Sequence, residues 1–137
     1  MELQDYIRPV EKTVFADLDL AFNIHPVKRD LVLSTNTNAV KRALKNLVLT
    51  NHYERLFHPE IGSNVTKLLF EPMSPLVANH IETEIYNTIV NFEPRVRLSS
   101  IEVEGDDDYN GYNIIITYYE ANSTTPITVD FLLERLR

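Results

Sequence analysis

Apolar residues recur at helical spacing in two stretches of the chain. The first stretch has the i, i+3, i+4, i+7, i+8 pattern of one buried helical stripe, with Val40, Ala43, Leu44, Leu47 and Val48. In the second stretch, every fourth residue is apolar, with Val77, Ile81, Ile85 and Ile89. This spacing predicts a helix that buries one face over about four turns.

Polar residues with helix-capping side chains precede both stretches. Thr37 or Asn38 is a suitable N-cap for the first helix. Ser74-Pro75 combines an N-cap residue with a proline at the first helical position, so the second helix is expected to begin there. Between the two, Ser63 or Asn64 is expected to cap a short helix that runs to Phe70.

The period of the pattern changes to two after residue 100. Residues 101–104 alternate between aliphatic and acidic side chains, which predicts a half-exposed strand. The segment 105–111 has turn chemistry and ends in Asn-Gly, a dipeptide typical of hairpins. Residues 114–119 are predicted to be the central strand, and residues 127–134 alternate again.

These elements predict an α+β fold. Two main helices and a short one would pack on a small, mostly antiparallel sheet that ends in a C-terminal strand. Two shorter extended pieces are expected within residues 14–24 and at residues 31–33. Residues 1–13 are polar and interrupted by Pro9, and we interpret them as an N-terminal arm. Residues 14–137 would then form a single domain.

The second helix runs into a charged, rigid bend at Glu93, Pro94, Arg95 and Arg97. Pro94 fixes its own φ and disfavours the α region for Glu93, so the helix must end here. Two roles for the bend stay open. Glu93 and Arg95 can form an internal ion pair that joins the helix end to the sheet. Alternatively, Arg95 can donate bidentate hydrogen bonds to a carboxylate or to helix-end carbonyls of a partner.

Composition excludes several classes of function. The net charge of −7 argues against nucleic acid as a partner, because phosphate binding needs clustered Lys and Arg. The chain has no cysteine, and its three glycines form no phosphate loop. Its four histidines lack metal-ligand spacing, so no metal or cofactor is expected. Neither a signal peptide nor an apolar run long enough to span a bilayer is recognisable.

The candidate acids of a peptidoglycan-cleaving glycosidase are four carboxylates: Glu54, Glu60, Glu71 and Glu93. Glycoside hydrolysis needs two carboxyls across a cleft, one of them with a raised pKa. Glu54 adjoins Arg55 and Glu93 lies near Arg95, and a nearby cation lowers a carboxyl pKa. The chain also has no tryptophan to build a sugar cleft. We therefore expect no catalytic residues, and the glycosidase remains the rival interpretation.

Three segments in fixed order carry a family resemblance. They are Tyr53-Glu-Arg-Leu-Phe-His-Pro-Glu-Ile-Gly-Ser63, Leu68-Leu-Phe-Glu-Pro72 and Phe92-Glu-Pro-Arg-Val96. This ordered set resembles the baseplate wedge, or sheath-initiator, family of contractile-tailed bacteriophages, and the match covers about residues 15–120. That family also supplies type VI secretion baseplates and has been labelled lysozyme-like. The resemblance implies a structural virion protein that is made in the host cytoplasm.

The resemblance also implies partners for two regions. The Glu93-Pro94-Arg95 bend would dock on the core helical bundle of neighbouring wedge proteins. The last strand resembles the one with which a sheath subunit pairs with its neighbour, so it would start sheath assembly. Hub or tube proteins are further candidate partners. Independently of the family, an exposed edge strand offers unpaired N–H and C=O groups to another chain. The strand comprises Ile127, Thr128, Val129, Asp130, Phe131, Leu132 and Leu133.

The first of the three segments is expected to be an ordered loop. Its structural residues are Glu54, Arg55, Pro59, Gly62 and Ser63, with Gly62 as the natural site of a positive φ. Tyr53, Leu56 and Phe57 are expected to pack the loop from inside. The alternative is that part of this apolar patch faces a partner.

Overall fold

A computed structural model describes residues 13–18, 21–121 and 123–135 of the chain. By its internal contacts the chain divides into two compact units, Met1–Ala39 and Val40–Arg137. The predicted N-terminal arm lies almost entirely outside the described residues. Its separation from a single domain at residues 14–137 stays a prediction.

The first unit contains a two-stranded antiparallel sheet. β1 (Ala16–Leu18) pairs with β2 (Leu33–Thr35), and an isolated bridge joins Ile24 to Leu31. The Asn36 side chain accepts hydrogen bonds from the backbone N–H groups of Val14 and Phe15, at 2.9 and 3.4 Å. Both predicted extended pieces therefore contribute to strands, although β2 begins only at the last residue of the second piece.

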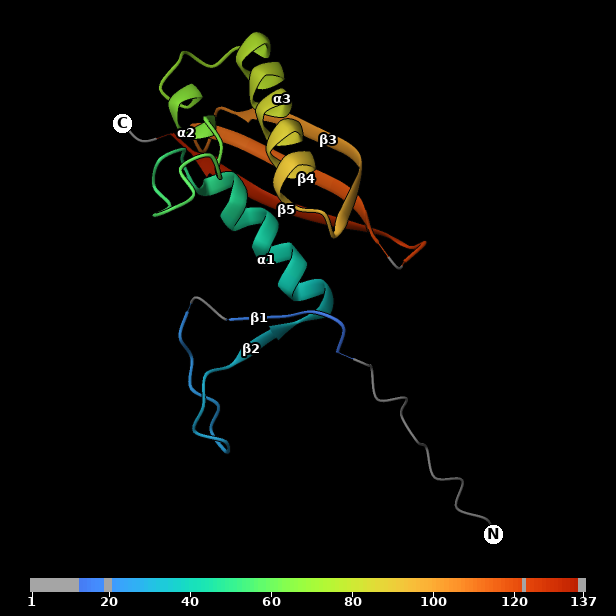
Figure 1. The fold of residues 1–137 in the computed structure, drawn as a ribbon. Coiled ribbons are helices and arrows are strands. Elements are labelled where there is room, and N and C mark those ends of the chain that lie inside the picture. The colour runs from blue at the N-terminus through green and yellow to red at the C-terminus, as the bar shows by residue number, and fades with distance from the viewer. Residues whose placement is uncertain (1–12, 19–20, 122, 136–137) are drawn as a thin grey trace. The chain divides into compact units, whose positions relative to one another are not determined.

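The second unit is built on a three-stranded antiparallel sheet with the strand order β3-β4-β5 (Figure 1). Its strands are β3 (Val96–Asp106), β4 (Gly111–Glu120) and β5 (Pro126–Glu134). A register shift between Leu98 and Ser100 marks a bulge in β3. The predicted central strand is confirmed, because β4 pairs with both neighbours.

The turn between β3 and β4 is shorter than the predicted segment 105–111. Gly105 and Asp106 still belong to β3 and pair with Tyr112 and Gly111. The Asp106 side chain then accepts the backbone N–H groups of Asp108 and Tyr109, at 3.1 and 3.2 Å. This local bonding by a short carboxylate ends the strand and starts the turn.

The three predicted helices are present, with differences at their ends. They are α1 (Asn36–Leu49), α2 (Val65–Leu68) and α3 (Pro75–Phe92). The N-cap prediction for α3 is confirmed, since the Ser74 side chain accepts the N–H of Val77 and Pro75 is the first helical residue. The prediction for α1 is wrong, because β2 leads directly into the helix at Asn36. Helix α2 ends at Leu68, before the predicted Phe70.

The helices of the second unit bury their apolar stripes together with one face of the sheet. Helix α3 packs on β3, and α2 packs on α3. The buried apolar side chains of the two long helices, β4 and β5 are Ala39, Val40, Leu44, Val48, Val77, Ile81, Ile85, Ile89, Tyr112, Ile114, Ile116, Tyr118, Val129, Phe131 and Leu133. Burying one such Val, Leu or Ile stabilises the fold by roughly 1.5–3 kcal/mol. The α+β prediction with a C-terminal strand is thus confirmed.

Candidate functional site

The bend after α3 is closed by a bidentate ion pair. The Arg95 guanidinium donates from Nε to Oε1 and from Nη2 to Oε2 of Glu93, both at 2.7 Å. The helix cannot continue because Pro94 follows, and Glu93 leaves it with φ −125° and ψ 82°. Glu93 is buried, whereas the Arg95 side chain is 25% exposed. The internal ion pair is therefore present, and docking through the exposed part of Arg95 stays a prediction.

The end of β4 lies against this bend. The Arg95 carbonyl accepts the Ala121 N–H at 3.0 Å, and Val96 pairs with Glu120. Burial raises the pKa of Tyr118 to about 12, and the charges of Glu120 and Glu93 add to the shift. The Tyr118 hydroxyl and Glu120 Oε1 are buried without a hydrogen bond to any described residue. Neither residue was recognised as part of the site from the sequence.

Arg97, the fourth predicted contact residue, belongs to β3. It pairs with Tyr119 of β4, and its side chain is exposed. Successive side chains of a strand point to opposite faces, so Arg97 lies on the opposite face from the buried Val96. The bend and the first residues of β3 therefore present an exposed arginine beside a partly covered one.

The outer edge of β5 is the second region that is predicted to contact a partner. In the described part of the chain, β5 pairs only with β4. The Arg135 N–H donates to the Asn110 carbonyl, which sets the alternation of backbone groups along the strand. By that alternation, the N–H groups of Thr128, Asp130 and Leu132 point away from β4. Ile127, Val129, Phe131 and Leu133 share the core-facing side, and the last three are buried.

The loop between α1 and α2 is closed by polar contacts. The Ser63 hydroxyl donates to the Val48 carbonyl at 2.6 Å, and the Glu54 carboxylate accepts the backbone and side-chain N–H groups of Asn51 at 2.9 and 2.7 Å. Gly62 has φ 139°, and a Cβ there would lie 2.7 Å from the Thr50 carbonyl oxygen. The Pro59 carbonyl accepts the Tyr53 N–H at 2.9 Å. These contacts close the loop, and the structural role of the five predicted loop residues stays a prediction.

The prediction that Tyr53, Leu56 and Phe57 pack the loop is wrong. Their exposed fractions are 83%, 82% and 95%. Hydrogen bonds rather than apolar contacts close the loop, so these side chains are left on the surface. The Arg55 side chain makes no hydrogen bond or ion pair with another described residue.

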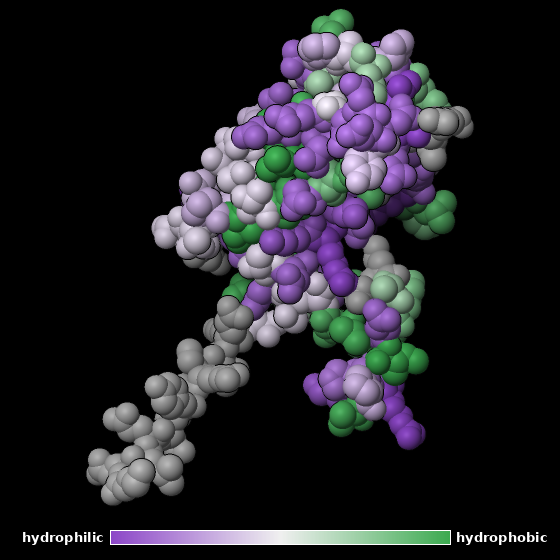
Figure 2. Space-filling model, turned by 180° about the vertical axis from the view of Figure 1, so that it is seen from behind, coloured by the Kyte–Doolittle hydropathy of each residue, from purple (hydrophilic) through white to green (hydrophobic). Residues whose placement is uncertain are grey.

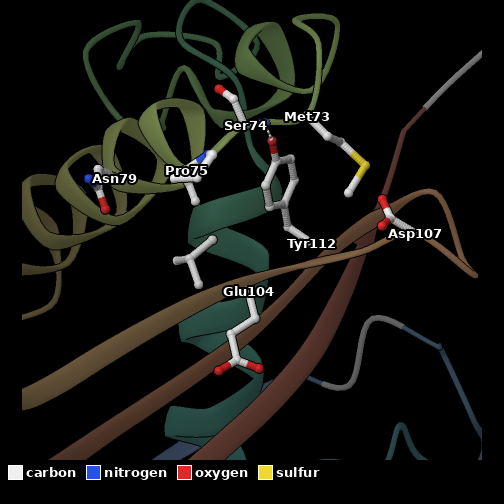
Figure 3. Close-up of a pocket in the computed structure, with 10 residues that line it drawn as sticks. Met73, Ser74, Pro75, Asn79, Glu104, Asp107 and Tyr112 are labelled. Atoms are coloured by element: carbon white, nitrogen blue, oxygen red, sulfur yellow. Dashed lines mark hydrogen bonds between the residues drawn. The ribbon is translucent and has the colours of Figure 1, made fainter.

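The four candidate acids are absent from the cavity beside α3 in the described part of the chain. A cavity of about 420 Å³ lies between the start of α3 and β3, and its acidic lining residues are Glu104 and Asp107 (Figure 3). The Glu104 carboxylate points away from Tyr112 and Pro75 in the same view. None of Glu54, Glu60, Glu71 and Glu93 lines this cavity. Because glycoside hydrolysis needs two carboxyls that face each other across a cleft, a cavity whose Glu104 carboxylate points away from Tyr112 and Pro75 is a poor glycosidase site.

The pKa shifts of the loop carboxylates also have the wrong sign for a general acid. Hydrogen bonds from Asn51 lower the pKa of Glu54. A backbone hydrogen bond at Glu60 lowers the pKa of that residue, and the His58 side chain lowers it further. A glycosidase acid needs a raised pKa, so neither group suits the role.

The described residues contain neither a cluster of metal ligands nor a membrane-spanning helix. No group of three or more His, Asp or Glu side chains there is arranged to hold a metal ion. Among the same residues, no helix has the length and hydrophobicity to cross a bilayer. The face shown in Figure 2 is mostly hydrophilic, with hydrophobic residues in separate patches. Recognition through that face would therefore use individual side chains and not a continuous apolar surface.

The second unit thus combines an ion pair at the end of α3, a loop closed by polar contacts and a terminal strand that pairs, among the described residues, with β4 alone. The chain belongs to the family of baseplate wedge protein gp25, whose sequence model matches residues 34–123. Its members are structural baseplate components. Baseplate wedge protein gp25 of Enterobacteria phage T4 is 36% identical over 62 residues, which span 45% of this chain and 46% of that protein. The aligned part is thus a little under half of the relative.

Solved structures share the fold. A candidate tail lysozyme from Geobacter sulfurreducens has a TM-score of 0.70 at 19% identity, covering 78% of this chain and 97% of that one. A chain of the anti-feeding prophage baseplate has a TM-score of 0.62 at 16% identity, covering 90% of this chain and 87% of that one. These likenesses concern the fold, so a lysozyme description of one neighbour does not establish catalysis.

Proposed function

We propose that this chain is a non-enzymatic subunit of a phage tail baseplate that joins the wedge to the contractile sheath. In this proposal, Glu93, Pro94, Arg95 and Arg97 dock on neighbouring wedge proteins, and β5 starts the sheath. The observation that carries the proposal is the outer edge of β5, which no other described strand pairs with, in a member of the baseplate wedge family. Virion location, assembly in the host cytoplasm and contacts with hub or tube proteins belong to the same proposal.

The geometry of the bend supports docking. Glu93 uses both carboxylate oxygens to fix the plane of the Arg95 guanidinium, so little side-chain entropy remains to be lost on binding. The exposed quarter of Arg95 and the exposed Arg97 then offer guanidinium N–H donors to a partner. The natural complement of these donors is a carboxylate or the carbonyl end of a helix on a wedge protein.

The alternation along β5 supports recruitment of another strand. Thr128, Asp130 and Leu132 direct unpaired backbone groups outward, as the register with β4 implies. A sheath strand added there would gain main-chain hydrogen bonds, and its side chains would extend the buried and exposed faces of the sheet. Asp130 and Glu134 on the exposed face favour a strand that carries Lys or Arg.

Site-specific cross-linking tests this proposal. A photo-reactive side chain is introduced at Thr128 in one variant and at Thr117, its paired residue on the central strand, in the control. In assembled particles, Thr128 is expected to cross-link to the sheath protein, and Thr117 is not. Equal cross-linking from both positions, or cross-linking from neither, would overturn the edge-pairing proposal.

A further inference from the structure

Two large apolar side chains stand almost fully in solvent at the tip of the loop between α1 and α2. Leu56 is 82% exposed and Phe57 is 95% exposed. Single exposed apolar residues are common on protein surfaces, but two adjacent ones at this level on one tip are a candidate contact. Neither Leu56 nor Phe57 belongs to the bend after α3 or to β5.

The loop holds these side chains in a fixed position. Tyr53 N–H donates to the Pro59 carbonyl at 2.9 Å, and His52 Nδ1 lies 3.1 Å from the Glu60 carbonyl. At the base, Ser63 N–H donates to the Thr50 carbonyl at 2.8 Å, and Asn51 and Ser63 form a parallel bridge. A loop that is bonded across its neck in this way does not collapse onto its own apolar residues.

The backbone at the tip is strained. Tyr53 has φ 71° and Phe57 has φ 68°, the left-handed region that bulky side chains rarely adopt. Such strain persists only where surrounding contacts enforce it, and it concentrates at binding sites. Here the polar contacts of the neck enforce a conformation that exposes Phe57.

We propose that Leu56 and Phe57 insert into an apolar pocket of a neighbouring wedge protein, and that Arg55 pairs with a carboxylate at the rim of that pocket. This inference rests on the proposed function, because the partner is a wedge subunit. The positive charge of Arg55 at the tip of the loop indicates that the rim of the pocket carries a carboxylate. The Arg55 guanidinium makes no hydrogen bond or ion pair with another described residue, whereas His58 already contacts Glu60 at 3.2 Å.

The flanking charges favour a protein over a lipid surface. Glu54 and Glu60 lie on either side of the tip, and the whole chain carries −7. Anionic membranes attract basic segments and would repel these carboxylates. A protein pocket, by contrast, can place a single carboxylate next to Arg55 and keep negative charge away from Glu54 and Glu60.

The test compares two double variants of the full chain. Leu56→Ser/Phe57→Ser changes the tip, and the control Leu76→Ser/Val90→Ser changes residues of α3 that are 65% and 55% exposed. The probe is the wedge complex purified from particles made without this chain. The tip variant is expected to bind it at least about tenfold more weakly, as for a contact that anchors an interface. The control is expected to bind within about twofold, as for surface changes.

Thermal unfolding of both variants guards against loss of the fold, and both are expected to unfold as the unmodified chain does. Arg55→Glu is expected to weaken binding and Arg55→Lys to retain most of it. Unchanged affinity of the tip variant would overturn the inference. Self-association of the free chain that the tip variant abolishes would also overturn it, because the pocket would then belong to a second copy.

Failure of this inference is distinguishable from failure of the proposed function. If the tip variant binds normally while Thr128 still cross-links to sheath, only the contact at Leu56 and Phe57 is wrong. If the unmodified chain fails to bind the wedge complex, the proposed function itself fails.

Discussion

Arg95 holds both carboxylate oxygens of Glu93, each at 2.7 Å, at the point where α3 turns into β3. Glu93 is 6% exposed, so its charge depends on this pair for compensation. Glu120 and Tyr118 lie nearby and supply no further cation. The pair is therefore both part of the fold and the proposed docking surface.

Replacing Arg95 with alanine is expected to destabilise the isolated chain. The substitution leaves a buried carboxylate unpaired, which costs about 1–3 kcal/mol at a site with partial solvent access. Denaturant unfolding of the purified chain measures this loss. An Arg95→Ala variant as stable as the unmodified chain would show that Glu93 does not need its partner.

The double variant Glu93→Met/Arg95→Met separates stability from docking. It removes both charges together, and replacing a buried ion pair by apolar residues is often neutral for stability. The variant is expected to unfold as the unmodified chain does and yet to bind the wedge complex weakly. Normal binding by this variant would leave the pair with a structural role alone.

The pKa of Tyr118 predicts loss of stability at alkaline pH. Burial raises this pKa from 10.0 to about 12, so the folded protein holds its proton where the unfolded chain has lost it. The stabilisation is full below pH 10 and is lost as pH rises through the folded-state pKa, a change of about 2–3 kcal/mol. Unfolding measured at a series of pH values is expected to show this fall.

Tyr118→Phe is expected to remove that fall. It should not weaken the fold below pH 10, because the hydroxyl makes no hydrogen bond to a described residue. Tyr109→Phe, at an exposed position, is the control and should keep the unmodified pH dependence. The same alkaline fall in Tyr118→Phe would assign the effect to another group.

Gly62 is expected to tolerate no side chain. A Cβ at φ 139° would lie 2.7 Å from the Thr50 carbonyl oxygen, so Gly62→Ala should destabilise the fold by more than about 1 kcal/mol. Gly105→Ala is the control, because there the nearest atom to the Cβ is the end of the flexible Met73 side chain, at 3.1 Å, and the Tyr112 ring lies at an ordinary contact distance of 3.9 Å. Equal stability of the two variants would contradict the close packing of the loop neck.

The purified chain is expected to leave peptidoglycan intact. Its loop carboxylates have lowered pKa values, and none of the four candidate acids lines the cavity beside α3. Release of soluble sugar fragments from cell walls is the measurement, with Glu54→Gln and Glu93→Gln as controls. Release that either substitution abolishes would restore the glycosidase interpretation.

The elements were predictable where local chemistry determines them. Ser74-Pro75 and Pro94 bound α3, and Asn110-Gly111 ends the β3–β4 turn. The neighbours of the bend could also have been found, because counting back along a hairpin from that turn brings Glu120 opposite Val96 to within the one-residue bulge. This inference needs the register between β3 and β4, and the hydrophobic periodicity of the two strands does not determine that register.

The exposure of Tyr53, Leu56 and Phe57 was beyond prediction from composition. Apolar residues in a loop are usually buried beneath it, and here the neck bonds of Asn51, Glu54 and Ser63 replace that packing. The boundary of the turn at Asp106 depended likewise on one side-chain hydrogen-bond pattern. Such contacts are decided by tertiary geometry rather than by hydrophobic period.

Deleting residues 126–137 would not test the β5 edge cleanly. Val129, Phe131 and Leu133 are buried, so the deletion removes part of the core along with the edge. A proline at Asp130 is more selective, because the N–H it removes points away from β4 and an outward edge position tolerates proline. Asp130→Ala is the matched control, since it removes the carboxylate and keeps the N–H.

Sheath length on particles assembled with these two variants, measured by electron microscopy, is the most direct measurement. If the sheath starts by pairing with β5, Asp130→Pro baseplates are expected to carry little or no sheath. Asp130→Ala baseplates are expected to carry sheaths of normal length. Normal sheaths on Asp130→Pro particles would contradict a starting role for this strand.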